Sequence, residues 1–191
     1  MTTTTEQPTE TITPTPGTYT IDPVHSTVGF VARHLMASKV RGAFTEFDGT
    51  IVVGETPEAS SVTARVSAAS ISTHQPQRDE HLRSSDFLEA STHPDLTLVS
   101  KRVVPRRDGH FDLLADLTVR GVTKEITVDL EFLGQGPGMQ PGTTVVGFEA
   151  TATINRRDFG VSFNAPIGDA GGLVVSNKIE LELNVEAVAT A

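Results

Sequence analysis

Several polar side chains in this 191-residue sequence are of types that exchange protons or bind anions. Asp22 and His25 are three positions apart, and a carboxylate beside an imidazole can act as a general acid–base pair. His81 and Asp86 form a second such pair in a segment with helical features. Arg156 carries a planar guanidinium that can donate paired hydrogen bonds to phosphate or carbonyl oxygens. The same groups could instead satisfy one another as structural pairs, since buried polar groups need partners.

The sequence motifs of common enzyme and metal sites are absent. There is no Gly-x-Ser-x-Gly segment of a serine nucleophile and no Gly-x-Gly-x-x-Gly segment of a dinucleotide site. The six histidines lack the His-x-x-x-His spacing of a helical metal site, although histidines on distant strands could still meet across a barrel. Because there is no cysteine, thiol catalysis and disulfides are excluded. We therefore predict no catalytic residue, no metal and no cofactor.

The strongest pattern that could position these side chains is the alternation of apolar and polar residues over positions 111–132. Side chains of a strand point to opposite faces in turn, so the pattern predicts two strands with one apolar and one polar face. Such a sheet must cover its apolar face, and closing into a barrel is one solution. The apolar positions are Phe111, Leu113, Ala115, Leu117 and Val119, then Val122, Ile126, Val128, Leu130 and Phe132.

Similar patterns elsewhere predict about eight strands, mostly antiparallel. They cover residues 18–21 with 26–33, 39–53 interrupted at Asp48-Gly49, 62–68, 96–104, 111–119, 122–132, 145–154 and 173–188. A helix is predicted at residues 76–88, which begin with a proline and acidic residues. Residues 1–16 are almost entirely Thr, Pro, Glu and Gln and predict a disordered tail.

Composition restricts the partners of the predicted domain. With 24 acidic and 15 basic residues the formal net charge is -9, which argues against nucleic acid and anionic membrane surfaces. No apolar run reaches the length of about 18 residues that a transmembrane helix needs. The first residues lack the basic start and apolar stretch of a secretory signal, so we expect a cytoplasmic location. The interior of an eight-stranded barrel is either filled by side chains or holds one small ligand, and composition leaves both open.

Several segments form an ordered set of local motifs along the chain. They are Tyr19-Thr-Ile-Asp22-Pro-Val-His25-Ser26, Phe30-Val-Ala-Arg-His34, Ser38-Lys-Val-Arg-Gly42-Ala-Phe44, Ile71-Ser-Thr73, Arg78-Asp79-Glu-His81-Leu82, Ser85-Asp86-Phe87, His93-Pro94, Leu117-Thr-Val-Arg-Gly121-Val-Thr123 and Ile154-Asn-Arg156-Arg-Asp158-Phe159-Gly160. In this order they resemble the YceI-like family of lipocalin-like polyisoprenoid-binding proteins. The resemblance covers about residues 17–188, with Tyr19 where many relatives have tryptophan.

The resemblance implies an all-β fold for residues 17–191, an eight-stranded antiparallel lipocalin-like β-barrel with a short helical insertion around residues 76–88. It also implies binding, storage or transport of a long-chain isoprenoid or similar amphiphilic lipid, of the polyprenyl phosphate or isoprenoid quinone type, in the barrel's apolar interior. For the ligand head group we expect Asp22, His25, His34 and Arg156. For the ligand tail, strand parity indicates Phe30, Phe44, Leu113, Leu117, Ile126, Phe148 and Leu181.

Two alternatives stay open beside the lipid-binding role. The barrel could be a stress-linked scavenger of hydrophobic small molecules, or, less in keeping with the missing motifs, an uncharacterised enzyme. Many relatives are exported, whereas this sequence shows no signal. Phe159, Phe163 and the apolar residues at 165–168 could plug the barrel or form the face of a homodimer.

Overall fold

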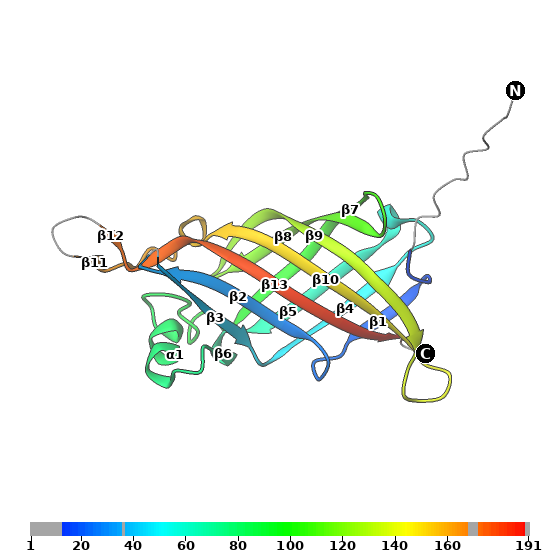
Figure 1. The fold of residues 1–191 in the computed structure, drawn as a ribbon, viewed down its shortest axis with the longest axis horizontal. Helices are drawn as coiled ribbons and strands as arrows, with labels where there is room; N and C mark the ends of the chain where they lie inside the picture. Colours follow the sequence, from blue (N-terminus) through cyan, green and yellow to red (C-terminus); the bar gives the residue numbers. More distant parts are fainter. Residues whose placement is uncertain (1–12, 36, 168–171, 190–191) are drawn as a thin grey trace, which may run out of the picture.

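The computed structural model describes residues 13–35, 37–167 and 172–189. It confirms the predicted eight-stranded antiparallel barrel (Figure 1). The barrel closes because the strand at residues 17–21 pairs with residues 50–53 on one side and with residues 187–189 on the other. In ring order the strands are β1 (Gly17–Ile21), β4 (Phe47–Val53), β5 (Ser61–Ser67), β7 (Asp95–Pro105), β8 (His110–Val119), β9 (Val122–Pro137), β10 (Thr144–Asn155) and β13 (Val175–Ala189).

Three further strands extend the sheet at one end of the barrel. β2 (Thr27–His34) pairs with β13, β3 (Ser38–Phe44) pairs with β2, and β6 (Ile71–Ser72) pairs with β3. Ile21 of β1 lies opposite Ala187 and Thr27 of β2 lies opposite Asn184, so β1 and β2 continue one another along β13. Residues 22–26 therefore loop out of an otherwise continuous wall strand. β11 (Pro166–Ile167) and β12 (Gly172–Leu173) form a separate pair.

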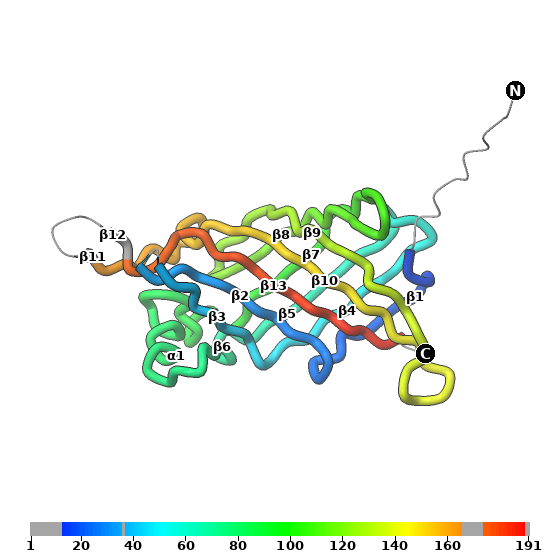
Figure 2. The backbone as a smooth tube through the Cα atoms, in the orientation of Figure 1, coloured from blue at the N-terminus to red at the C-terminus, as the bar shows by residue number. Residues whose placement is uncertain are grey.

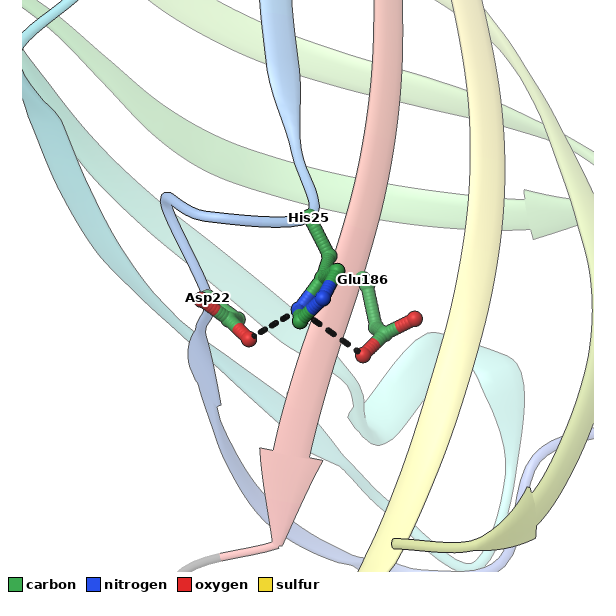
Figure 3. Close-up of side chains that lie close together, drawn as sticks. All are labelled: Asp22, His25 and Glu186. Atoms are coloured by element: carbon green, nitrogen blue, oxygen red, sulfur yellow. Dashed lines mark hydrogen bonds and ion pairs between the residues drawn. The ribbon is translucent and has the colours of Figure 1, made fainter. Parts of the chain in front are cut away.

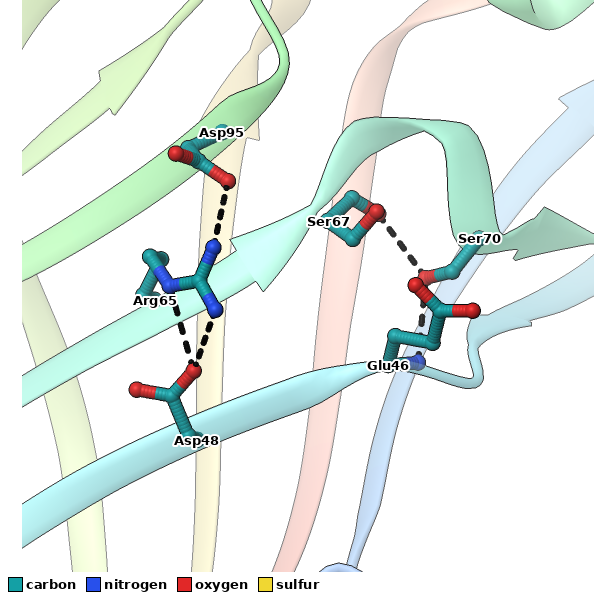
Figure 4. A network of polar contacts seen from close by, with 6 residues as sticks. All are labelled: Glu46, Asp48, Arg65, Ser67, Ser70 and Asp95. Atoms are coloured by element: carbon teal, nitrogen blue, oxygen red, sulfur yellow. Dashed lines mark hydrogen bonds and ion pairs between the residues drawn. The ribbon is translucent and has the colours of Figure 1, made fainter.

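The break between β3 and β4 lies at Thr45 and Glu46, so the interruption predicted at Asp48-Gly49 is wrong. Gly49 is inside β4, where a Cβ atom would lie 2.7 Å from Ile21 Cδ1. Gly49 thus allows close packing across the wall and makes no turn. At the true break, the Glu46 amide donates to Ser70 Oγ over 3.1 Å, and Ser70 Oγ donates to the Ser67 carbonyl (Figure 4).

The predicted helical insertion is present but shorter than residues 76–88. Helix α1 (Pro76–Arg83) starts with the Gln75 side chain accepting from the Arg78 amide, and turns follow from residue 84. The insertion packs beside β3 and β6 at one end of the barrel, at the left in Figures 1 and 2. Three short 3-10 helices, η1 (Pro57–Ala59), η2 (Ala68–Ser70) and η3 (Arg156–Phe159), complete the described elements. No helix in the described part of the chain has the length and apolar character to cross a membrane.

The alternation over residues 111–132 positions the core as predicted. In β8 every second residue, from Phe111 to Val119, is buried, and Ala115 is fully buried. The main cluster joins Phe111, Leu113 and Ala115 to Phe132, Phe148 and residues of β1, β4 and β13, whereas Leu117 and Val119 pack in a second cluster with Phe159. The disordered tail predicted for residues 1–16 lies largely outside the described residues. Its last four residues, 13–16, are described and lie at the end of the barrel opposite α1.

Candidate functional site

The barrel encloses a cavity of about 410 Å³. This volume is within the range of roughly 300–1,000 Å³ that is usual for small-ligand pockets. Composition did not decide between a filled and a hollow barrel interior, and the structure has a hollow one. All eight ring strands contribute to its wall, together with β2 and β3. The main apolar side chains of the wall are Ile21, Val28, Phe44, Phe47, Ile51, Val53, Val62, Val66, Leu96, Leu98, Val103, Phe111, Leu113, Leu117, Val119, Val128, Leu130, Phe148, Ile154, Leu181, Leu183 and Val185.

Small residues keep this space open. Ala64 of β5 and Ala150 of β10 line the cavity at positions where a larger side chain would project into it. Phe132 and Phe148 pack with their ring centroids 5.5 Å apart on neighbouring strands, and Phe148 also faces the cavity. The wall is thus aliphatic and aromatic, which suits a hydrocarbon guest better than a polar one.

Five of the seven predicted tail residues line the cavity: Phe44, Leu113, Leu117, Phe148 and Leu181. Phe30 is not among the described lining residues. Its ring covers the backbone of Gly42, where an added Cβ atom would collide with Phe30 Cζ. The ring centroids of Phe30 and Phe44 are 5.8 Å apart. Ile126 packs instead beside the cluster around Phe159. Strand parity identifies the face of a side chain but not its height along the barrel, which explains both differences.

One end of the cavity opens between the chain before β1 and the segment after β4. Thr13, Pro14 and Pro16 line it on one side, and residues 54–57 with Ser60 and Ser61 line it on the other. Thr15 donates from its amide and its hydroxyl to Gln135 Oε1 over 2.8 and 3.0 Å. The Tyr19 hydroxyl donates to the Thr15 carbonyl over 2.7 Å. The segment at residues 13–16 is therefore fastened across the mouth of the barrel.

The other end of the barrel is closed by side chains. Phe159 of η3 is 2 % exposed and packs with Leu117 and Val119. Beyond it, the rings of His81, Phe87 and Phe163 contact one another with centroids 4.9–5.2 Å apart. His81 Nε2 also hydrogen-bonds Asp86 over 2.8 Å. The His81–Asp86 pair, which the sequence offers for acid–base chemistry, is thus part of this aromatic contact and lies outside the described cavity lining.

Arg156 lies at the closed end, where it serves the backbone. It is 5 % exposed and donates to the carbonyls of Ser176, Val161 and Val175 over 3.0, 2.8 and 3.4 Å. These hydrogen bonds use the N–H groups of the guanidinium that a phosphate would need. The arrangement matches the structural alternative, in which the arginine ties the late loop to the barrel.

Asp22 and His25 meet on the outer wall of the barrel, in the loop between β1 and β2 (Figure 3). His25 Nδ1 lies 2.8 Å from Asp22 Oδ2 and 3.7 Å from Glu186 Oε1. The hydrogen bond to Asp22 raises the pKa of His25, and the hydrogen bond from His25 lowers the pKa of Asp22. Glu186 belongs to the outward face of β13, because its neighbour Val185 lines the cavity.

The loop is fastened to one residue of β13. The Asp22 amide donates to the Glu186 carbonyl over 2.9 Å. Ser26 Oγ donates to the same carbonyl and accepts from the Glu186 amide over 2.9 Å. The Asp-x-x-His-Ser motif therefore holds together a wall strand at the point where the chain loops out.

The four predicted head-group residues do not come together. His34 is exposed at the far end of β2 from His25, and Arg156 lies at the closed end. None of the four is among the described residues that line the cavity. Glu186 was not predicted as part of the site, although it lies within the predicted last strand at 173–188. Ligand atoms of Asp22, His25 and Glu186 lie within 4.8 Å of one another, a spacing that could hold a cation, but the hydrogen-bonded pair accounts for it without one.

The fold and the cavity define a closed antiparallel barrel with an apolar interior. The YceI-like domain model matches residues 19–187, and the chain belongs to this family. It is 35 % identical over 170 residues to a UPF0312 protein of Staphylococcus aureus (strain MSSA476), covering 88 % of this chain and 95 % of the relative.

Solved structures share the fold. The YCEI protein of Campylobacter jejuni superposes with a TM-score of 0.71 at 28 % identity, covering 83 % of this chain and 90 % of that one. A polyisoprenoid binding domain from Saccharophagus degradans, implicated in plant cell wall breakdown, superposes with a TM-score of 0.66 at 16 % identity and covers 90 % of this chain and 98 % of its own.

Proposed function

We propose that the protein binds a long-chain isoprenoid or similar amphiphilic lipid inside the barrel. The observation that carries this proposal is the apolar cavity of about 410 Å³ that is open at one end. A hydrocarbon tail would lie among the inward side chains, and a polar head would stay near the mouth at residues 13–16 and 54–61. The polyisoprenoid binding domain with the same fold supports the choice of ligand class.

The energetics favour a long chain. Each methylene group removed from water contributes roughly 0.8 kcal/mol. Binding costs about 4–15 kcal/mol in lost translational and rotational freedom. An isoprene unit of five carbon atoms contributes about 4 kcal/mol, so about four units are needed to overcome the top of that range. We therefore expect affinity to rise with chain length until the cavity is filled.

Mass spectrometry of organic extracts from the purified protein tests the proposal. We expect a long apolar molecule at near-stoichiometric amount, or its uptake when the extracted protein is mixed with a polyprenol. A clean extract followed by no uptake would refute it. Recovery of the added lipid chemically unchanged after long incubation would support a binding role over an enzymatic one.

Transport, a homodimer and a cytoplasmic location remain predictions. A carrier should pass its lipid to vesicles quickly, whereas a scavenger should retain it, so the rate of transfer to vesicles distinguishes the two. Sedimentation of the purified protein tests the homodimer.

A further inference from the structure

The charges around the cavity limit the head group of the ligand. Among the described residues that line it, Asp48 and Glu55 are the ones with ionisable side chains, and both are acidic. No lysine, arginine or histidine of the described chain contributes to the wall. The stretches outside the described residues, 1–12, 36, 168–171 and 190–191, contain none of these three residue types in the sequence.

Two arginines of the barrel wall, Arg65 and Arg106, are already paired. Arg65 donates to Asp48 Oδ2 over 2.8 and 3.1 Å and to Asp95 Oδ1 over 3.1 Å, on the outer face of the barrel (Figure 4). Arg106, in the turn between β7 and β8, pairs with Asp112 over 2.8 Å and reaches Asp129 at 3.5 Å. Each of these arginines faces two carboxylates, so neither is free to pair with a phosphate.

The mouth offers uncharged hydrogen-bonding groups instead. Thr13, Thr56, Ser60 and Ser61 lie along it. Ser60 Oγ accepts from the Gly54 amide over 3.0 Å and donates to the Thr56 carbonyl over 3.3 Å. The hydroxyl groups of Thr13, Thr56 and Ser61 suit a carbonyl or hydroxyl oxygen. Glu55, which is exposed beside them, has no ion-pair partner among the described residues.

From this arrangement we infer that the ligand has an uncharged, oxygen-bearing head group, such as an alcohol or a quinone, and no phosphate. The inference rests on the proposed function and narrows its ligand class. A phosphate or diphosphate at the mouth would meet Glu55 and the field of a chain of net charge -9 with no counter-charge in the wall. The wall offers such an anion no ion pair that would offset the repulsion from Glu55.

Two lipids with the same polyprenyl chain test the inference, one ending in a hydroxyl group and one in a diphosphate. At an ionic strength near 0.15 M we expect the alcohol to bind at least tenfold more tightly. Added salt should narrow this ratio, because it screens the repulsion. Equal or tighter binding of the diphosphate would overturn the inference and leave the proposed function intact. Binding of neither lipid would overturn both.

A charge reversal at the mouth sharpens the test. Glu55→Lys should tighten diphosphate binding at least threefold and leave the alcohol within twofold of its original Kd. Glu58→Lys is the matched control: it makes the same charge change three residues away in η1, at an exposed side chain outside the lining. An equal gain in the two variants would mean that net charge alone acts. An amine-headed lipid that binds more tightly than the alcohol would overturn the uncharged head in favour of a cationic one.

Discussion

Replacing Ala150 by leucine tests whether the cavity is real space available to a guest. Ala150 is 5 % exposed, lies opposite Leu183 and Leu130 on the neighbouring strands, and faces the cavity. Leucine adds three carbon atoms, which would contribute up to about 2.4 kcal/mol if all were removed from water. Restricting the new side chain costs roughly 0.5–1 kcal/mol. The empty protein should therefore gain stability, by about 1.5 kcal/mol, while its lipid affinity falls at least tenfold.

Ala115→Leu is the matched control for this change. Ala115 is also an inward-facing alanine in the core, but it is fully buried and is not among the described lining residues. Extra carbon atoms in a packed core cost about 1–3 kcal/mol. Urea unfolding of the two lipid-free variants should give changes of opposite sign. If Ala150→Leu destabilises the barrel as much as Ala115→Leu does, no void is present at Ala150 and the reasoning fails.

Three further predictions concern residues outside the cavity wall. Arg156→Ala should lower the free energy of unfolding by about 3 kcal/mol, since buried carbonyls lose their donor, and urea unfolding measures this; a change in the alcohol-to-diphosphate ratio would instead restore its head-group role. Gln135→Ala removes the hydrogen-bond partner of Thr15, so the release of lipid to vesicles should become faster, as measured by fluorescence. An unchanged rate would show that the segment at residues 13–16 does not limit lipid exchange. NMR titration of His25 should give a pKa above its ordinary value of about 6.5, and Asp22→Asn should lower that pKa. The contribution of His25 to the free energy of unfolding is present at low pH and is lost as the pH rises through the raised pKa. The contribution of Asp22 is lost as the pH falls through its lowered pKa.

Periodicity was enough to predict the strands and their buried face, whereas the eight-stranded barrel was implied by the resemblance to the YceI-like family. Phe111, Leu113 and Leu117 alternate with polar residues so regularly that one face had to be buried, and the structure buries it. The β3–β4 break was misplaced because Gly49 resembles a turn glycine in sequence. Its actual role depends on Ile21, which lies 28 positions earlier, and such a close approach has no local signal.

The polar site was harder to predict because residue type does not reveal which face or end of the barrel a side chain occupies. Asp22 and His25 do interact, but their loop leaves the wall strand and turns them outward. Arg156 was predicted from the chemistry of its guanidinium, which here donates to the Val161 carbonyl and to the carbonyls of Val175 and Ser176 in β13. The mouth residues were missed because serine, threonine and proline in a loop carry no pattern specific to a binding site.

The cavity is costly to the fold, and this cost itself argues for a guest. At roughly 24 cal/mol for each Å³ of void, 410 Å³ corresponds to as much as about 10 kcal/mol, close to the whole net stability of an ordinary domain. Leucine at Ala64 or Ala150 would recover part of that energy, yet both positions hold the smaller side chain. A lipid tail returns the same energy only when it is bound, so occupancy and stability are linked through mass action. A barrel that closes one end with Phe159 and leaves the other to hydroxyl groups places that guest in one orientation, tail inward and uncharged head at the mouth.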